Sequence, residues 1–317
     1  MVIKYNDVNN MNTHKILALT GVTGKKSGKV LVDYLSNNIN EVNNRFPDGI
    51  KALTRDKSNT DYILNKLPNI KICRGDFSDD KFLEESLKDV DTLIHIASIR
   101  LSSKLIDACV INKVRRVILV HTTGVYSKYK EASYEYSLID KYVTDTCKNN
   151  NIILTILRPT MIYGNIYDNN VIKFIKMVDK LPIMPVVNKA MYKLQPVNYK
   201  DLGKAYYDVL MNEETTANKS FNLSGKEPIY LRDMLKEIGK NLGKEVKFIN
   251  CPYIIAYIGS WIIYLITLTK KDYREKVQRL CEDRIFSHEE ATIAFNYNPM
   301  SFEDGIKEEI KMYIQNK

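Results

Sequence analysis

The sequence has few features of an extracellular or metal-dependent protein. Its cysteines are five in number, lie far apart and include no CxxC pair: Cys73, Cys109, Cys147, Cys251 and Cys281. This usage is typical of a reducing cytosol and argues against a disulfide framework or a zinc site. The four histidines do not cluster along the chain, and "HEEAT" at His288 lacks the second histidine that a zincin helix requires. We therefore expect no bound metal and a cytoplasmic protein.

The chain also lacks an apolar leader and a basic tract. Its first residues, "MVIKYNDVNNMNTHK", contain no apolar run of the kind found in secretory signals, and we expect a polar, frayed tail. The net charge is +9, but the basic residues are scattered, with no run of five or more. No helix-turn-helix, zinc finger or aromatic-basic RNA motif accompanies them. We expect a small-molecule substrate and no nucleic-acid partner.

From residue 15 onward, short apolar runs alternate with segments of helical periodicity. Strands are expected at 15–20, 50–55, 70–77, 91–98, 115–123 and 152–159, and helices at 27–38, 80–89, 104–112 and about 132–148. Strands that are apolar on both faces and alternate with helices predict a parallel sheet covered on both sides. Right-handed crossovers wind such a sheet into a doubly wound, Rossmann-like α/β domain that binds ligands beyond the carboxyl ends of its strands.

After residue 160 this alternation stops. The stretch "LPIMPVVNKAMYKLQPV" is extended and interrupted by prolines, and amphipathic helices follow it. There is no internal repeat and no low-complexity linker. We expect a Rossmann domain at 13–165, onto which segments of 192–225 pack, and a smaller, partly interleaved C-terminal α+β substrate domain at 166–317.

Eight segments follow one another in a familiar order: "LTGVTG", "RGDFSD", "IHIAS", "HTTGVYS", "LRPTMIYG", "LQPVNYKDLGKA", "FNLSG" and "FNYNPMSFEDGIKEEI". From residue 15 to 312 the chain resembles the extended or atypical short-chain dehydrogenase/reductase family, the NAD-dependent epimerase/dehydratase group. The resemblance implies an NAD(P)-binding oxidoreductase or epimerase. Its substrate would carry a carbonyl or hydroxyl group, as a nucleotide sugar or an apolar, lipid-like molecule does.

The glycine turn after the first strand is the main cofactor candidate. A P-loop requires GxxxxGK[ST], which no register of "LTGVTGKKSGKV" supplies. The stretch resembles TGxxG with its third glycine displaced by one residue to Gly28. Gly21 permits a tight turn and Gly24 a close approach of backbone to pyrophosphate. Ser27 is a candidate helix cap, and the expected cofactor contacts are Gly21, Thr23, Gly24, Lys25, Lys26 and Ser27; the alternative is a tight turn without phosphate.

Further cofactor contacts are implied at the later strand ends. Where NAD-preferring relatives have an acid, the second strand ends in Arg55, whose guanidinium suits a 2′-phosphate. This favours NADP(H) over NAD(H), with a solvated arginine as the alternative. The resemblance also implies that Asp76 and Phe77 lie beside the adenine and that Ala97 and Ser98 lie beside its ribose. It implies that Arg158 and Pro159 flank the nicotinamide, the alternative for Arg158 being a buried ion pair.

The catalytic residues are where the chain departs from the family pattern. The family pairs a Ser or Thr after the fifth strand with a YxxxK on the next helix, and Thr122, followed by Thr123, occupies the first position. Family spacing from Arg158 puts Ala132 and Tyr136 where Tyr and Lys belong. The one literal YxxxK joins Tyr126 to Lys130, only four residues after Thr122.

Two classes of function therefore stay open. The first is an enzyme whose acid/base is Tyr126 or Tyr136 with Thr122, and whose substrate pocket contains Thr160, Met161, Tyr163 and Gln195. The second is a non-catalytic NAD(P)H-binding regulator, redox sensor or assembly subunit. A homodimer through 104–112 and 132–148 is a further expectation from the family.

The stretch "CPYIIAYIGSWIIYLITLT", residues 251–269, carries no charge and is followed by "KKDYREK". Three interpretations compete: a buried helix or cleft lid, a peripheral patch that touches membrane or a lipid-like substrate, and a transmembrane span. The first is favoured and the span is disfavoured, because motifs of soluble relatives flank the stretch on both sides.

Overall fold

The computed structural model of the chain describes residues 14–129, 131–270 and 272–317. The tail expected at the N-terminus, up to residue 13, and Lys130 of the literal YxxxK lie outside the described residues. The chain divides into two compact units, each built from separate stretches. Unit 1 comprises the described part of Met1–His121 together with Leu138–Leu157 and Tyr207–Ser220. Unit 2 comprises Thr122–Ser137, Arg158–Tyr206 and Phe221–Lys317.

A seven-stranded sheet with the order β11-β6-β5-β4-β1-β2-β3 is the centre of the fold. Its strands are β1 Ile16–Thr20, β2 Ile50–Thr54, β3 Lys71–Arg74, β4 Val90–His95, β5 Arg116–Val120, β6 Ile153–Pro159 and β11 Lys219–Leu223. The neighbours from β3 to β6 are all parallel; Leu19 of β1, for example, faces Ala52 of β2 and Ile94 of β4. The predicted doubly wound α/β fold is confirmed.

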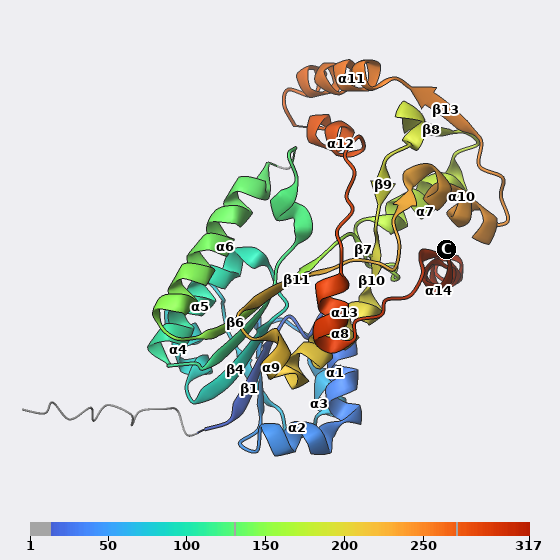
Figure 1. Cartoon of the computed structure of the whole chain (residues 1–317). Coiled ribbons are helices and arrows are strands. Elements are labelled where there is room, and N and C mark those ends of the chain that lie inside the picture. Colours follow the sequence, from blue (N-terminus) through green and yellow to red (C-terminus); the bar gives the residue numbers. More distant parts are fainter. Residues whose placement is uncertain (1–13, 130, 271) are drawn as a thin grey trace, which may run out of the picture. The chain divides into compact units, whose positions relative to one another are not determined.

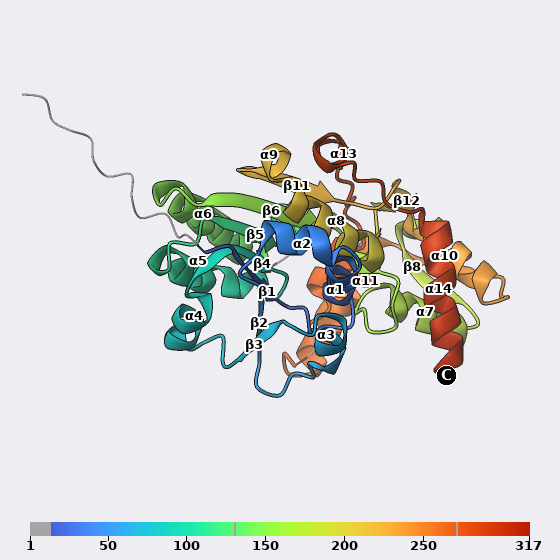
Figure 2. The ribbon, with the colours of Figure 1, turned by 90° about the horizontal axis from the view of Figure 1, so that it is seen from below.

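Helices cover both faces of this sheet in unit 1. Figures 1 and 2 show α4 Asp80–Leu87, α5 Ser102–Ile111 and α6 Ala132–Asn149 on one face. On the other face lie α1 Ser27–Asn37, α2 Ile39–Arg45 and α3 Asp61–Lys66. The sequence predicted α1, α4, α5 and α6 but not the short helices α2 and α3. Apolar side chains such as Leu93, Leu105, Val117 and Val143 fill the core under α4–α6, each stabilising the fold by about 1.5–3 kcal/mol through burial.

Unit 2 consists of three two-stranded sheets with helices around them. β10 (Val197–Asn198) pairs with β7 (Ile162–Tyr163), β12 (Ile229–Tyr230) with β9 (Lys193–Leu194), and β13 (Phe248–Cys251) with β8 (Met184–Val187). Helices α7 (Val171–Lys180), α10 (Leu231–Asn241) and α14 (Phe302–Gln315) enclose a second core that includes Ile175, Leu235 and Ile306. The remaining helices are α8 (Tyr199–Met211), α9 (Glu213–Thr216), α11 (Tyr253–Ile266), α12 (Arg274–Arg279) and α13 (Glu289–Phe295), with 3₁₀ turns η1 (Ile99–Leu101), η2 (Thr123–Tyr126) and η3 (Asn188–Ala190).

The uncharged stretch forms α11 and is exposed. Ser260 is the one buried residue of this helix, and isoleucines such as Ile254 and Ile266 expose 67% and 76% of their surface. The interpretation as a buried helix is therefore wrong, because most of the apolar side chains find no partner. Within the described parts of the chain, no helix combines the length and the apolar character that crossing a membrane requires.

Candidate functional site

The turn between β1 and α1 is built around two glycines that the fold itself requires. Gly21 has φ +77°, and a Cβ there would lie 2.8 Å from the Ala97 nitrogen at the end of β4. A Cβ on Gly28 would lie 2.4 Å from the Gly21 carbonyl oxygen, so the displaced glycine lets α1 pack against the turn. Gly24 differs, because its Cβ would meet only the Gly21 oxygen, at 3.4 Å. The missing side chain at Gly24 is therefore not needed by the chain's own packing, and it leaves exposed backbone open to a ligand.

Helix α1 presents its amino end to the same turn. Lys26 is the N-cap residue, its side chain makes no capping hydrogen bond, and the first turn contains no acid. The prediction that Ser27 caps the helix is wrong, since Ser27 is the first helical residue and is buried. Thr23 and Lys26 are half-buried, and Lys25 is exposed. Uncapped N–H groups, the helix dipole and two lysines form an environment suited to an anion such as phosphate.

The loop after β2 holds Arg55 at the second strand end. Arg55 is exposed, and within the described residues no partner pairs with its guanidinium. The loop is fixed by Arg74 of β3, which donates to the carbonyls of Asp56 and Ser58 at 3.0 and 2.9 Å and to Thr60 Oγ1 at 2.8 Å. Sequence reasoning missed Arg74, although it is the first letter of the "RGDFSD" motif. Arg55 is therefore an exposed cation without a partner among the described residues, and it lies on a loop whose backbone Arg74 holds in place.

The residues after β3 and β4 have different surroundings. Asp76 is exposed and accepts a hydrogen bond from the Ser78 amide at 2.8 Å, and its bonds to Ser78 lower the pKa of its carboxyl. Phe77 is buried in the core with its ring edge-on to Phe82. Ser98 is exposed and caps η1 through its Oγ. Asp76 and Ser98 are thus accessible at the strand ends, whereas Phe77 packs inside.

Two histidines that are scattered in the sequence stand on neighbouring strands. His95 ends β4, and its ring nitrogens lie 2.7 Å from Thr20 Oγ1 and 3.0 Å from the Ser98 carbonyl oxygen. Complete burial is the main cause that lowers the pKa of His95 to about 4, and the charge of nearby His121 lowers it further. His95 is therefore neutral at physiological pH. In the sequence, His95 and His121 were marked only by their places in the motifs "IHIAS" and "HTTGVYS".

His121 follows β5 and joins a second chain of hydrogen bonds. Its Nε2 lies 3.0 Å from Ser102 Oγ on α5, and its Nδ1 is hydrogen-bonded to an Asp140 carboxylate oxygen on α6. Sequence reasoning missed all three residues. Across the described residues, no group of three His, Cys, Asp or Glu side chains is arranged to hold a metal ion.

The catalytic candidates begin with the turn η2 in unit 2. Thr122 is its N-cap, and its Oγ1 accepts a hydrogen bond from the Gly124 amide at 3.0 Å. Thr123 is buried and donates from Oγ1 to the Pro159 carbonyl at 3.2 Å. The Thr122 hydroxyl retains its proton for donation to a ligand, because the cap uses it only as an acceptor. Thr123, by contrast, uses its proton to connect η2 with the end of β6.

Tyr126 lies at the end of η2 and is half exposed. Its ring packs against Phe286 at a centroid distance of 5.6 Å, and the Arg158 guanidinium lies 5.8 Å from the ring centroid. The next residues are held by Glu282, which accepts from the Ser127 hydroxyl at 2.8 Å and the Lys128 amide at 2.9 Å. An exposed phenol with a guanidinium near its ring is thus present on a turn that Glu282 braces.

Tyr136 is the other tyrosine candidate and is buried on α6. One helical turn after it stands Asp140, and Ala132 begins the helix. The lysine that follows, Lys141, is exposed and pairs with Asp145 at 2.6 Å. On α6 no lysine therefore stands one turn after a tyrosine, where the family's dyad requires it.

The substrate candidates differ in accessibility. Thr160 and Met161 are half-buried, and the Thr160 hydroxyl donates to the Gln195 carbonyl. Tyr163 is 1% exposed, and its ring packs on Phe302. The amide of Gln195 is used at both ends, since Nε2 donates to the Gly225 carbonyl at 2.8 Å and Oε1 accepts from the Phe286 amide at 3.1 Å. Gln195 thus fixes the phenylalanine that packs on Tyr126.

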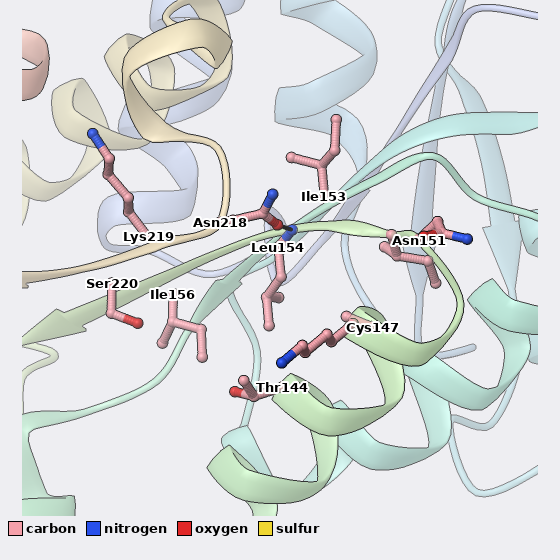
Figure 3. A pocket seen from close by; sticks show the side chains of 11 residues that line it. Thr144, Cys147, Asn151, Ile153, Leu154, Ile156, Asn218, Lys219 and Ser220 are labelled. Atoms are coloured by element: carbon pink, nitrogen blue, oxygen red, sulfur yellow. Dashed lines mark hydrogen bonds between the residues drawn. The ribbon is translucent and has the colours of Figure 1, made fainter.

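Unit 1 contains a pocket of about 520 Å³ (Figure 3). It is lined by Thr144 and Cys147 of α6, by Ile153 and Leu154 at the start of β6, and by Lys219 at the start of β11. The cofactor candidates follow the carboxyl ends of the strands, whereas this pocket lies at amino ends. It is therefore not the dinucleotide crevice.

Comparisons with known proteins agree with this arrangement. The model of the NmrA-like family matches residues 13–263. No curated protein matches the chain. An Escherichia coli NADPH-dependent quinone oxidoreductase, solved with NADPH, is 16% identical with a TM-score of 0.72, covering 92% of this chain and 98% of that one.

Two sugar-nucleotide enzymes are similar as well. A Streptomyces venezuelae dTDP-glucose 4,6-dehydratase, with NAD and TYD bound, is 17% identical with a TM-score of 0.68, covering 95% of this chain and 97% of that one. A Bacillus cereus UDP-glucuronic acid 4-epimerase, in complex with UDP-glucuronic acid and NAD, is 17% identical with a TM-score of 0.69, covering 95% and 100%. These structures share the Rossmann-like fold that the motifs predicted. Since the family model matches most of the sequence, the chain belongs to the NmrA-like family.

Proposed function

We propose that the chain binds a nicotinamide dinucleotide at the carboxyl ends of β1, β2 and β4. The observation that carries this proposal is the turn of Gly21 and Gly24, which leaves exposed backbone and the uncapped amino end of α1 where a pyrophosphate would lie. The ionised carboxylate of Asp76 and the accessible Ser98 add polar groups for the adenosine part. Structural relatives of the same fold were solved with NAD or NADPH.

NADP(H) is proposed in preference to NAD(H). Arg55 directly follows β2, is exposed and has no partner among the residues that the structure describes; a carboxylate there would repel a 2′-phosphate, whereas a guanidinium attracts it. Arg74 braces the loop through three hydrogen bonds, so little ordering of the loop backbone is needed on binding. Five free cysteines also support the proposal of a cytoplasmic location.

The proposed reaction is hydride transfer to or from a carbonyl or hydroxyl carbon, as in an oxidoreductase or epimerase. The bound dinucleotide supplies the hydride chemistry. In reduction the Tyr126 hydroxyl gives its proton to the carbonyl oxygen, and in oxidation the Tyr126 phenolate takes the proton of the substrate hydroxyl; Thr122 donates a hydrogen bond to the same substrate oxygen. The guanidinium of Arg158 at the Tyr126 ring stabilises negative charge that develops there.

A second candidate is a non-catalytic NAD(P)H-binding regulator, redox sensor or assembly subunit. It is favoured by α6, on which Ala132 and Tyr136 stand at the dyad positions and Asp140 follows one turn later. A homodimer through α5 and α6 fits either candidate, since Ile111, Leu138 and Tyr142 of these helices expose 60%, 49% and 43% of their surface. Gel filtration at several concentrations tests the dimer.

A single-turnover experiment separates the two candidates. The full chain is loaded with NADPH and mixed with quinones or nucleotide keto-sugars, and loss of the reduced cofactor is followed by absorbance. For an enzyme we expect consumption with one carbonyl class, a loss of at least about 100-fold in Y126F, and little change in Y129F, an exposed neighbour. Bound NADPH that no carbonyl consumes would reject the enzyme and favour the regulator.

A further inference from the structure

Helix α11 has two different apolar faces. At 100° per residue, Ile254, Ile255, Ile258, Ile262, Leu265 and Ile266 fall within one arc of about 120°. The aromatic residues, Tyr253, Tyr257, Trp261 and Tyr264, fall within the adjoining arc of about 80°, in which Trp261 lies next to Ile254. Ile263 falls in neither arc. The helix is thus sorted into an aliphatic face and an aromatic face, although no residue from 251 to 269 carries a charge.

The chain itself uses the aromatic face. Tyr253 stacks on Tyr257 with ring centroids 5.6 Å apart, and Trp261 meets Tyr264 edge-on. The Arg274 guanidinium, at the start of α12, lies 4.2 Å from the Trp261 ring centroid and 4.0 Å from that of Tyr264. These contacts hold α11 against α12, so the orientation of the helix is fixed by its aromatic side.

The aliphatic face is left uncovered. The six residues that form it are between 51% and 76% exposed. Isolated exposed isoleucines are ordinary, but a continuous row of six is typical of a surface that binds something apolar. The aliphatic row therefore needs an occupant.

The length of α11 fits the surface of a membrane. Fourteen residues make a helix of about 21 Å, too short for a hydrocarbon core of about 30 Å but sufficient to lie in its interface.

Charge points in the same direction. The segment 270–279, "KKDYREKVQR", has five basic and two acidic residues, a net charge of +3. The acids pair with arginines, Asp272 with Arg274 and Glu275 with Arg279, whereas Lys270 and Lys276 are exposed. Two copies joined symmetrically through α11 would bring two basic segments together, which is unfavourable. An anionic bilayer attracts the same segment.

We propose that α11 docks on anionic lipid, with its aliphatic face among the acyl chains and Lys270 and Lys276 at the headgroup phosphates. The occupant is a bilayer surface containing anionic lipid, and the helix lies in the plane of that surface. This docking is independent of the proposed cofactor site, since no cofactor candidate belongs to α11 or to 270–279.

Vesicle flotation of the full chain tests the proposal, with phosphatidylcholine vesicles compared with vesicles containing 30% phosphatidylserine. We expect binding to the anionic vesicles that weakens with salt. We expect the double variant I258D/I262D to lose at least tenfold in binding, and K270E/K276E to lose the preference for anionic lipid. I293D on α13, where Ile293 is 79% exposed, is the matched control and should bind as the unmodified chain does.

Trp261 is the single tryptophan of the chain and provides a second readout. Its fluorescence should shift to the blue on vesicle addition and be quenched by lipids brominated on the acyl chain. Failure of the unmodified chain to float, or equal flotation of I258D/I262D, would overturn the proposal. So would a dimer in gel filtration that I258D/I262D converts to monomer, because a second copy would then cover the face. NADPH titration of I258D/I262D checks that the variant is folded.

Discussion

The Nε2 atom of His121 lies 3.0 Å from the Oγ atom of Ser102, and both side chains are buried. The other ring nitrogen of His121, Nδ1, is hydrogen-bonded to a carboxylate oxygen of Asp140. The connectivity is that of a Ser-His-Asp triad, but Ser102 is fully buried and cannot reach a substrate. We interpret the three residues as a connection between α5, β5 and α6 that fixes the backbone one residue before Thr122.

This interpretation predicts the effect of removing Asp140. D140A leaves the Nδ1 atom of the buried His121 without its hydrogen-bond partner and should lower the free energy of unfolding by about 1–3 kcal/mol. D140N keeps an oxygen that accepts from Nδ1 and should lose less. Urea unfolding measures both. A fluorophosphonate probe should leave Ser102 unlabelled; labelling there would mean that the serine is accessible and that the connection is a catalytic triad.

His95 predicts a stability change at acidic pH. Its pKa is lowered from 6.5 to about 4, mainly by burial, so the unfolded chain binds a proton at a higher pH than the folded one. Its contribution is complete above pH 6.5 and is lost as the pH falls toward 4, by up to about 3 kcal/mol. Urea unfolding between pH 4 and 7 should show a smaller loss in H95Q than in the unmodified chain. Equal pH dependence of the two proteins would contradict this assignment.

Glu309 of α14 predicts a change of the opposite sign. Its side chain is fully buried and accepts a hydrogen bond from the Gly164 amide at 2.7 Å. The pKa of its carboxyl is raised, chiefly by burial and to a lesser extent by a hydrogen bond with Asp168. The protonated form stabilises the fold, and this contribution declines as the pH rises above the ordinary value for glutamate.

E309Q is isosteric with the protonated acid and should unfold at nearly the same urea concentration at neutral pH. E309A should cost about 1–3 kcal/mol, because it leaves the buried Gly164 amide without the acceptor that Glu309 provides. If E309Q proved as destabilising as E309A, the carboxyl would have to be ionised in the folded protein.

Arg55 predicts cofactor discrimination. R55A removes one charge-assisted pair with the 2′-phosphate, so its Kd for NADPH should rise about 10- to 100-fold while its Kd for NADH changes little. K57A, two residues further along the same exposed loop, is the control and should bind both cofactors normally. Equal weakening of NADPH and NADH in R55A would mean that the arginine does not read the 2′-phosphate.

The sequence predicted those parts of the fold that local pattern determines. Runs such as "KILALT" and "RRVILVHTT" were recognised as buried strands because both their faces are apolar. The helix that follows the glycine turn was also predicted correctly. Only its N-cap was misjudged: the helix begins at Ser27 as expected, but the cap is Lys26, which depends on the backbone conformation at that residue.

Features that depend on distant contacts could not be predicted in this way. His95 and His121 are neighbours only because β4 and β5 pair. The uncharged run 251–269 contained no polar stripe to indicate a solvent side, so its sequence could not tell a buried helix from the exposed α11. Gln195 was expected to contact substrate, whereas both ends of its amide bond to the chain itself.

Isothermal titration of the intact chain with NADPH and with NADH, repeated on G24V, tests the central claim most directly. A Cβ at Gly24 meets only one backbone oxygen, at 3.4 Å, so G24V should fold normally by circular dichroism while its side chain blocks the pyrophosphate. We predict one site per chain, tighter binding of NADPH than NADH, and loss of both in G24V. Absence of binding to the unmodified chain, or undiminished binding to folded G24V, would contradict a dinucleotide site at this turn.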